Sequence, residues 1–145
     1  MTFKHIISRD NILFKQLKKL AESSRERRKL GETLLDGAHL VNTYLEVFGE
    51  PKLLVIAEGQ STAEVSHLIQ QLADIPTVMF PTLMFAELSP VASPTGIIAL
   101  VKTPVIEPVA DPKFTLMLED IQDPGNLGSM LRTAAAAGVE AVYLS

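Results

Sequence analysis

The segment from Lys113 to Ser145 constrains the fold of this chain more than any other stretch. A short apolar run from Phe114 to Leu118 predicts a buried strand. The turn-forming residues Asp123, Pro124 and Gly125 end that strand region and open a loop. The chain must therefore leave the strand and reverse direction within a few residues.

A helix is predicted to follow this loop. Asn126 is positioned to cap its N-terminus, Ala134 to Ala137 continue it, and Gly138 stands where a left-handed C-terminal cap would fall. Glu140 to Leu144 then form a second candidate strand. The order strand, loop, helix, strand predicts a βαβ unit with parallel strands and a right-handed crossover.

Gly128 and Arg132 are four residues apart and share one face of this helix. Helical side chains lean toward the N-terminus, and Gly128 has no side chain to block the path. The guanidinium is therefore expected to reach back toward Asn126 and the free N–H groups of the first turn, a setting that suits phosphate. From the residues alone, the alternative is a solvated arginine beside an asparagine that only caps the helix.

The 145-residue chain carries a net charge of −4, but its charge is segregated. Residues 1–29 hold nine Lys or Arg against three Asp or Glu, whereas the other 116 residues hold four against fourteen. A basic end of this kind is the natural place for a polyanion, although a solvated face is the competing interpretation. The candidate RNA-binding residues, here called the basic edge, are Arg9, Lys15, Lys18, Lys19, Arg25, Arg27, Arg28 and Lys29.

Alternating helices and strands predict a small α/β sandwich over the first hundred residues. A helix over Asn11–Ala21 is expected to bury Ile12, Leu13, Leu17 and Leu20, and Glu22–Lys29 is expected to be a charged loop or helix end. The other expected strands are 32–36, 52–57, 76–80 and 96–102, and the other expected helices are 38–48, a helix capped by Thr62, and 82–88. Three prolines within residues 104–112 predict an extended linker, which gives domains at 1–103 and 113–145.

Several classes of function are disfavoured by composition. The chain has no cysteine, and its three histidines are scattered without ligand spacing, so no metal site is expected. No apolar run approaches the ~20 residues of a membrane span, and residues 1–10 lack the apolar core of a signal peptide. Gly125–Gly128 supplies only Gly-x-x-Gly, which is neither a dinucleotide-binding fingerprint nor, after a strand, a KH loop.

The segment Leu118–Gly128, continued by Arg132–Ala134 and Gly138, resembles the first sequence motif of the SpoU-type RNA ribose methyltransferases. That family belongs to the knotted class that uses S-adenosylmethionine (SAM). Ile7–Asn11, Lys15, Arg27-Arg28, Leu34–Gly37 and Ser93–Ile97 resemble the substrate-binding domain that precedes the catalytic domain in many members. This domain is similar to the sandwich of kink-turn-binding ribosomal proteins. Asp36 and Thr95 depart mildly from the family pattern, which more often has glutamate and glutamine at these positions.

The resemblance implies a SAM-dependent 2′-O-ribose methyltransferase that acts on structured RNA, ribosomal or else transfer RNA. It implies Arg132 and Asn126 as catalytic residues, a homodimer for the complete enzyme and a cytoplasmic location. The two further family motifs that form the knot are not found in residues 1–145. The chain is therefore expected to be a fragment that has no cofactor-binding residues and is inactive alone. The alternative is a non-catalytic RNA-binding module.

Overall fold

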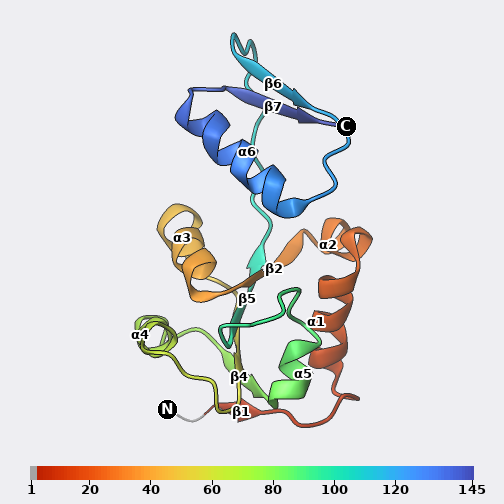
Figure 1. The fold of residues 1–145 in the computed structure, drawn as a ribbon. Coiled ribbons are helices and arrows are strands. Elements are labelled where there is room, and N and C mark those ends of the chain that lie inside the picture. The colour runs from red at the N-terminus through yellow and green to blue at the C-terminus, as the bar shows by residue number, and fades with distance from the viewer. Residues whose placement is uncertain (1–2) are drawn as a thin grey trace. The chain divides into compact units, whose positions relative to one another are not determined.

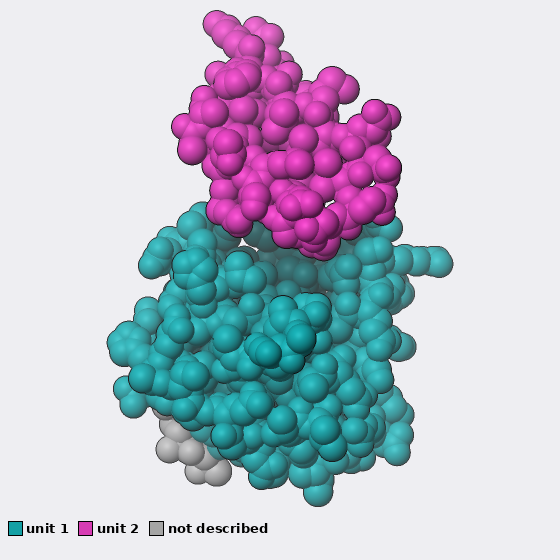
Figure 2. Space-filling view, viewed as in Figure 1, with its two compact units in different colours: residues 1–104 teal, residues 105–145 magenta. Residues whose placement is uncertain are grey.

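The computed structural model describes residues 3–145 and divides the chain into two compact units, residues 1–104 and residues 105–145 (Figure 2). Each unit is described by itself below. The boundary falls at the start of the proline-rich stretch.

Unit 1 is an α/β fold whose strands form one mixed sheet (Figure 1). The spatial order is β1-β4-β3-β5-β2; β1, β4 and β3 run parallel, whereas β5 is antiparallel to both β3 and β2. The strands are β1 (Lys4–His5), β2 (Glu32–Asp36), β3 (Leu53–Ala57), β4 (Thr77–Phe80) and β5 (Ile97–Lys102). The helices are α1 (Ile12–Glu22), α2 (Ser24–Leu30), α3 (Ala38–Phe48), α4 (Ala63–Gln71) and α5 (Thr82–Ala86).

Strand β3 lies at the centre of the sheet, and all five of its residues are buried. Its alternate side chains enter two separate cores. Val55 joins the core beneath α1 and α5, and Ile56 joins the core beneath α3 and α4. The helices therefore cover both faces of the sheet, with α1 and α5 opposite α3 and α4 (Figure 1).

The first helix confirms most of the predicted pattern but corrects one residue. Asn11 caps α1 by accepting hydrogen bonds from the backbone N–H groups of Leu13 and Phe14. Ile12, expected to be buried, is 76% exposed because it is the first residue after the cap and points away from the sheet. Phe14 takes the inward position and packs edge-on against Phe80, with ring centroids 5.3 Å apart.

Unit 2 contains β6 (Thr115–Leu118), α6 (Pro124–Ala136) and β7 (Ala141–Leu144). The two strands are parallel, as the sequence predicts. The prediction that the first strand is buried is wrong: Met117 is 80% exposed and Phe114 is 51% exposed. Leu116 and Leu118 face α6, whereas Met117 and Tyr143, which are paired on the other face, are 80% and 54% exposed. Within residues 3–145 that second face of the sheet is therefore open to solvent.

Helix α6 ends as expected at Gly138, which has a φ of +81°. The N–H of Val139 donates to the carbonyl of Ala134, and the N–H of Gly138 donates to the carbonyl of Ala135. This is the Schellman pattern, in which a left-handed glycine turns the chain out of the helix. The turn delivers the chain directly to β7.

Candidate functional site

Two regions carry the chemistry that the sequence predicts: the start of α6 in unit 2, and the basic edge on α1 and α2 in unit 1. At the first of these, Arg132 lies over Gly128. A Cβ built at position 128 would be 3.3 Å from Nη1 of Arg132, so any larger residue there would push the guanidinium slightly aside. Arg132 is exposed, its Nη2 donates to Oγ of Ser129 at 3.3 Å, and it forms no ion pair with any of residues 3–145. Its positive charge is therefore available to an external anion.

The cap of α6 is Asp123, and the prediction of Asn126 as the cap is wrong. The carboxylate of Asp123 accepts hydrogen bonds from the N–H groups of Gly125 and Asn126, at 3.1 and 3.3 Å, and Pro124 occupies the first helical position. An aspartate directly before a proline is the stronger N-terminal signal, because the proline lacks an N–H that would otherwise need a partner. Asn126 lies in the first turn with an exposed side chain.

This cap also corrects the expected anion site at free backbone N–H groups. The proline has no N–H, Asp123 accepts from the next two residues, and the N–H of Leu127 donates to the carbonyl of Asp123 at 3.0 Å. The N–H groups that we expected to bind a phosphate therefore already bind the carboxylate of Asp123, which favours the positive end of the helix dipole. Any anion held here depends on the guanidinium of Arg132.

The loop before α6 bends sharply at Asp120, which has a φ of +52°. A left-handed backbone is uncommon outside glycine, although aspartate tolerates it better than most residues. The side chain of Gln122 donates to the carboxylate of Asp120, and the N–H of Asp120 donates to the carbonyl of Ser145 at 3.4 Å. These contacts tie the loop to the end of β7.

The structure separates the eight residues of the basic edge into two groups. Arg9 and Lys18 both donate to Glu87, at 2.7 and 2.9 Å, and Lys15 donates to Asp10 at 2.9 Å. Arg27 donates to the carbonyls of Leu20 and Ala21, at 2.6 and 3.1 Å, and so caps the C-terminus of α1. These four residues are engaged within the protein.

The remaining four residues, here called the free cations, are Lys19, Arg25, Arg28 and Lys29. All four are exposed, and none of them forms an ion pair with another of residues 3–145. Three of them are on α2, which the sequence left open between a loop and a helix end. The free cations are the residues best placed to contact phosphates.

Glu87 holds the first group together, and sequence analysis did not identify it. The hydrogen bonds from Lys18 and Arg9 lower the pKa of Glu87, and the same contact with Glu87 raises the pKa of Lys18. The hydrogen bond from Lys15 likewise lowers the pKa of Asp10. Glu87 is distant in sequence from both of its cationic partners, so no local pattern indicates the contact.

A second unpredicted contact joins β2 to the loop after α5. Oγ of Ser89 donates to the carboxylate of Asp36, one of the two residues that depart from the family pattern. Burial raises the pKa of Asp36, and the hydrogen bond from Ser89 opposes that effect. The contact fixes the loop beside the turn at Gly37.

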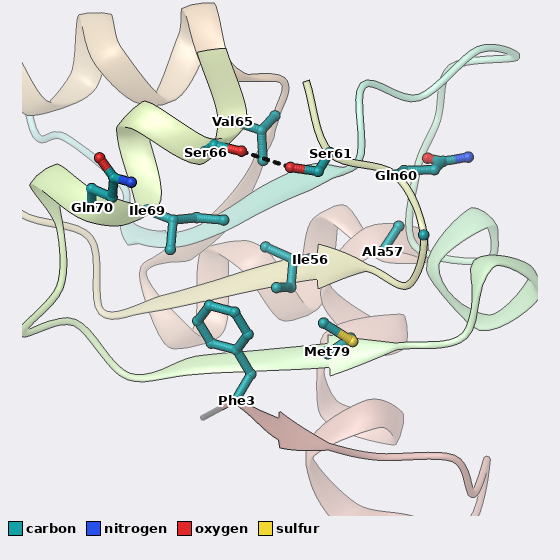
Figure 3. Close-up of a pocket in the computed structure, with 11 residues that line it drawn as sticks. Phe3, Ile56, Ala57, Gln60, Ser61, Val65, Ser66, Ile69, Gln70 and Met79 are labelled. Carbon is teal, nitrogen blue, oxygen red and sulfur yellow. Dashed lines mark hydrogen bonds between the residues drawn. The ribbon is translucent and has the colours of Figure 1, made fainter. Parts of the chain in front are cut away.

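Unit 1 has a pocket on each side of its sheet. One, of about 520 Å³, lies under α4, where Phe3, Ile56 and Met79 make an apolar wall and Ser61 and Ser66 hydrogen-bond at its rim (Figure 3). The other, of about 510 Å³, lies where α1 meets α2. The residues that line this second pocket include Leu20, Glu22, Arg27, Leu34, Glu87 and Leu88.

Unit 2 has a pocket at the carboxyl ends of its two strands. Ligands of parallel α/β sheets bind beyond the carboxyl ends of the strands. A pocket of about 480 Å³ lies there in unit 2, lined by Met117, Glu119, Tyr143 and Leu144 among others. Met117, Tyr143 and Leu144 are 54–80% exposed, so residues 3–145 leave this pocket open to solvent. The same residues contain no cluster of metal-ligating side chains and no helix long and apolar enough to cross a membrane.

Comparison with known proteins identifies the family. Residues 11–99 match the model of the MRM3-like substrate binding domain. The chain is 35% identical over 142 residues to the 23S rRNA (guanosine(2553)-2′-O)-methyltransferase RlmP of Bacillus subtilis; the match covers 97% of this chain and 54% of RlmP. The chain therefore belongs to the family of MRM3-like substrate-binding domains, and its resemblance to the SpoU-type RNA methyltransferases is confirmed.

Solved structures agree with this assignment. A crystal structure of an RNA 2′-O ribose methyltransferase is 27% identical with a TM-score of 0.77, covering 97% of this chain and 55% of the other. The SpoU methyltransferase AviRb from Streptomyces viridochromogenes, solved with AdoMet, has a TM-score of 0.75 over 92% of this chain and 52% of its own; at 20% identity this likeness shows the fold. The chain spans about half the length of these relatives.

Proposed function

We propose that this chain is the RNA-binding domain and the first part of the catalytic domain of a SAM-dependent rRNA 2′-O-ribose methyltransferase. In this proposal residues 1–103 bind the RNA, residues 104–112 are a linker, and residues 113–145 begin the SpoU domain. The match to the MRM3-like domain and the names of the relatives support it. SAM would supply the methyl group. The roles that we assign to residues of this chain are contacts with the RNA.

The placement of Arg132 over Gly128 carries the proposal, because it leaves on the surface of α6 a guanidinium that forms no ion pair with residues 3–145. An arginine stays protonated, so it does not act as the base that removes the proton of the ribose hydroxyl. Its planar fork suits the phosphate next to the reacting ribose, and its charge stabilises the alkoxide as that proton leaves. We assign Asn126, exposed six residues earlier on α6, to positioning the ribose.

Three finer features belong to the same proposal. The sandwich of unit 1 binds RNA in the manner of kink-turn-binding ribosomal proteins. The open face of β6 and β7 is covered, in the complete enzyme, by the rest of a knotted SAM-binding domain. That enzyme works in the cytoplasm as a homodimer, without a metal. The exposed Met117 and Tyr143 support a covering of the open face, because parallel sheets are normally buried on both sides.

The test is methyl transfer from labelled SAM to ribosomal RNA by the full-length protein. The expected product resists alkaline cleavage at one nucleotide, because methylation removes the 2′-hydroxyl that attacks the neighbouring phosphate. An Arg132→Ala protein is the matched control and is expected to leave that nucleotide cleavable. Absence of any methylated ribose with the parent protein, on ribosomal and transfer RNA alike, would refute the enzymatic assignment.

A non-catalytic RNA-binding module is the second candidate, and the exposed apolar wall of the pocket in unit 2 favours it. Isothermal titration of the full-length protein with SAM and, separately, with ribosomal RNA fragments distinguishes the two. Heat of binding with RNA but none with SAM would support the module. Binding of both supports the enzyme.

A further inference from the structure

The pocket where α1 meets α2 has an apolar floor and an acidic rim. Ala21, Leu34 and Pro90 supply the accessible apolar surface of the floor, above the buried Leu20 and Leu88, whereas Glu22 and Glu87 stand at the rim. Its volume of about 510 Å³ falls in the range of ~300–1,000 Å³ that small organic groups occupy in proteins. Half of the lining residues are apolar and the other half are polar or charged, a mixture that suits a flat ring with polar edges.

The charged side chains around this pocket differ in how many hydrogen bonds they make within the protein. Both carboxylate oxygens of Glu87 already accept a hydrogen bond, one from Arg9 and one from Lys18. Arg27, the one cation in the lining, donates to backbone carbonyls. Glu22 differs: among residues 3–145 it has an i,i+4 ion pair with Lys18, whose Nζ lies 3.9 Å from its Oε1, but it accepts no hydrogen bond. The carboxylate of Glu22 is therefore the acceptor that the pocket offers to a ligand.

This arrangement selects against a phosphate and for an uncharged ring that carries an N–H donor. A phosphate would meet two carboxylates and only an arginine that is already engaged. An exocyclic amino group on a nucleobase donates readily to a carboxylate, as in the pairing of glutamate with the N4 amino group of cytosine. The bases of single-stranded RNA can be splayed out of the stack, so the ring of one base is free to lie against the apolar lining.

We propose that this pocket binds one unpaired nucleobase of the RNA substrate through its exocyclic amino group, with Glu22 as the acceptor. The inference rests on the proposed RNA-binding function. The free cations Lys19, Arg25, Arg28 and Lys29 lie on α1 and α2, the helices that form the pocket, and hold the flanking phosphates. Phosphate contacts there supply affinity, and the pocket reads the base.

The experiment compares oligocytidylate with oligouridylate of about ten nucleotides, a length within the usual range for single-strand binding sites. Cytosine and uracil have nearly the same shape and differ at position 4, where cytosine has an amino group and uracil has a carbonyl oxygen. Fluorescence anisotropy with the 145-residue chain at low salt is expected to show about tenfold tighter binding of the cytidylate. Glu22→Gln is expected to reduce that ratio to about twofold or less, because the amide offers one oxygen and adds donors of its own.

Two matched controls separate the pocket from general charge and packing. Glu64→Gln makes the same change in charge at an exposed position of α4, on the opposite side of the sheet, and is expected to keep the ratio. Ala21→Leu fills the mouth of the proposed pocket, whereas Ser66→Leu fills the neutral pocket under α4 (Figure 3). Only Ala21→Leu should abolish the preference for cytidylate.

The outcomes separate this inference from the proposed function. Equal, salt-dependent binding of both oligonucleotides by the parent chain would overturn the base pocket and leave RNA binding intact. A preference for cytidylate that survives both Glu22→Gln and Ala21→Leu would also overturn it. Failure of the parent chain to bind either oligonucleotide would count against RNA binding by unit 1 and remove the inference with it.

Discussion

The guanidinium of Arg132 rests on the bare backbone of Gly128, with Nη1 at 3.3 Å from the place of a missing Cβ. Gly128→Ala should therefore act in opposite directions on stability and on activity. An alanine inside the exposed part of a helix stabilises it by about 0.5–1 kcal/mol relative to glycine. The new methyl group would displace the arginine, and a misplacement of this kind should lower the methylation rate by about tenfold or more.

A double-mutant cycle with Arg132→Ala checks that prediction. If the new methyl acts by moving the arginine, Gly128→Ala should cost nothing further in activity once Arg132 has been removed. Thermal melting of each variant reports the gain in stability separately. Additive losses of activity in the double mutant would show that Gly128 matters for another reason.

Replacing Arg132 tests the electrostatic role directly. Arg132→Ala should lower single-turnover methylation by the full-length protein by about 10²–10³, the usual loss when one electrostatic donor leaves a preorganised site. Arg132→Lys should restore little, because lysine offers a point charge in place of a planar fork. SAM affinity, measured by calorimetry, should stay near that of the parent. A folded Arg132→Ala enzyme with near-normal turnover would show that this arginine is an ordinary surface residue.

The corrected cap predicts different phenotypes for two neighbouring residues. Asp123→Ala removes the acceptor for two N–H groups and should destabilise α6 by about 0.5–2 kcal/mol. Asn126→Ala should leave the helix as stable as the parent and change only methylation. Hydrogen exchange at the amides of Gly125 and Asn126 measures the difference, since both should lose protection in Asp123→Ala alone. Equal protection in the two variants would contradict the assignment of the cap.

Much of the fold follows from local pattern. The apolar run of β3, the cap at Thr62 and the glycine at 138 each set their element through interactions within a few residues. Strand β1 could not be predicted in this way. It has two exposed residues, Lys4 and His5, and it exists because β4 offers a parallel edge more than seventy residues later.

In the candidate site, too, local spacing was predictable from the sequence and contacts between distant residues were not. The spacing of Gly128 and Arg132 correctly placed the guanidinium over Gly128, because both residues are on one helix, but the free N–H groups expected beside it are taken by Asp123. The basic edge could not be divided into engaged and free residues from sequence, since Glu87 reaches Arg9 and Lys18 only through the fold. The pocket at Glu22 was missed for the same reason, because its walls come from α1, α2, β2 and the segment after α5.

The pairing of Glu87 with Arg9 and Lys18 predicts an acid-sensitive contact. The pKa of Glu87 is lowered in the folded protein from its ordinary value of 4.5, so its contribution to stability is present above that pH. The contribution is lost as pH falls through the lowered value in the folded state. The pKa of Lys18 is raised from 10.5, so the contribution of the lysine is present below that pH and is lost only at higher pH. The contact therefore stabilises the fold across the neutral range.

Glu87→Gln isolates this effect. The parent chain should lose melting temperature more steeply than Glu87→Gln as pH falls below about 4.5, because only the parent has that carboxylate to protonate. Glu64→Gln, an exposed glutamate of α4, controls for the general change in charge and should follow the parent. Identical slopes for the parent and Glu87→Gln would show that the ion pairs add nothing to stability.

The division of the basic edge predicts which residues set the salt dependence of RNA binding. Each phosphate contact contributes about 0.7–0.9 to the slope of log K against log salt. We expect three charge reversals each to reduce that slope by the contribution of about one phosphate contact: Arg25→Glu, Arg28→Glu and Lys29→Glu. Each should weaken binding to all RNAs to a similar extent. Arg27→Ala should instead lower the melting temperature, because it leaves the carbonyls of Leu20 and Ala21 without their donor. Its salt slope should equal that of the parent.

Lys102→Glu provides the matched control for these reversals. Lys102 is an exposed lysine at the end of β5, outside the basic edge, and its side chain forms no ion pair with residues 3–145. It should lower RNA affinity only slightly, through the change in net charge, and leave the slope unaltered. If Lys102→Glu flattens the slope as much as Arg28→Glu does, the basic edge is a solvated surface and the phosphates bind elsewhere.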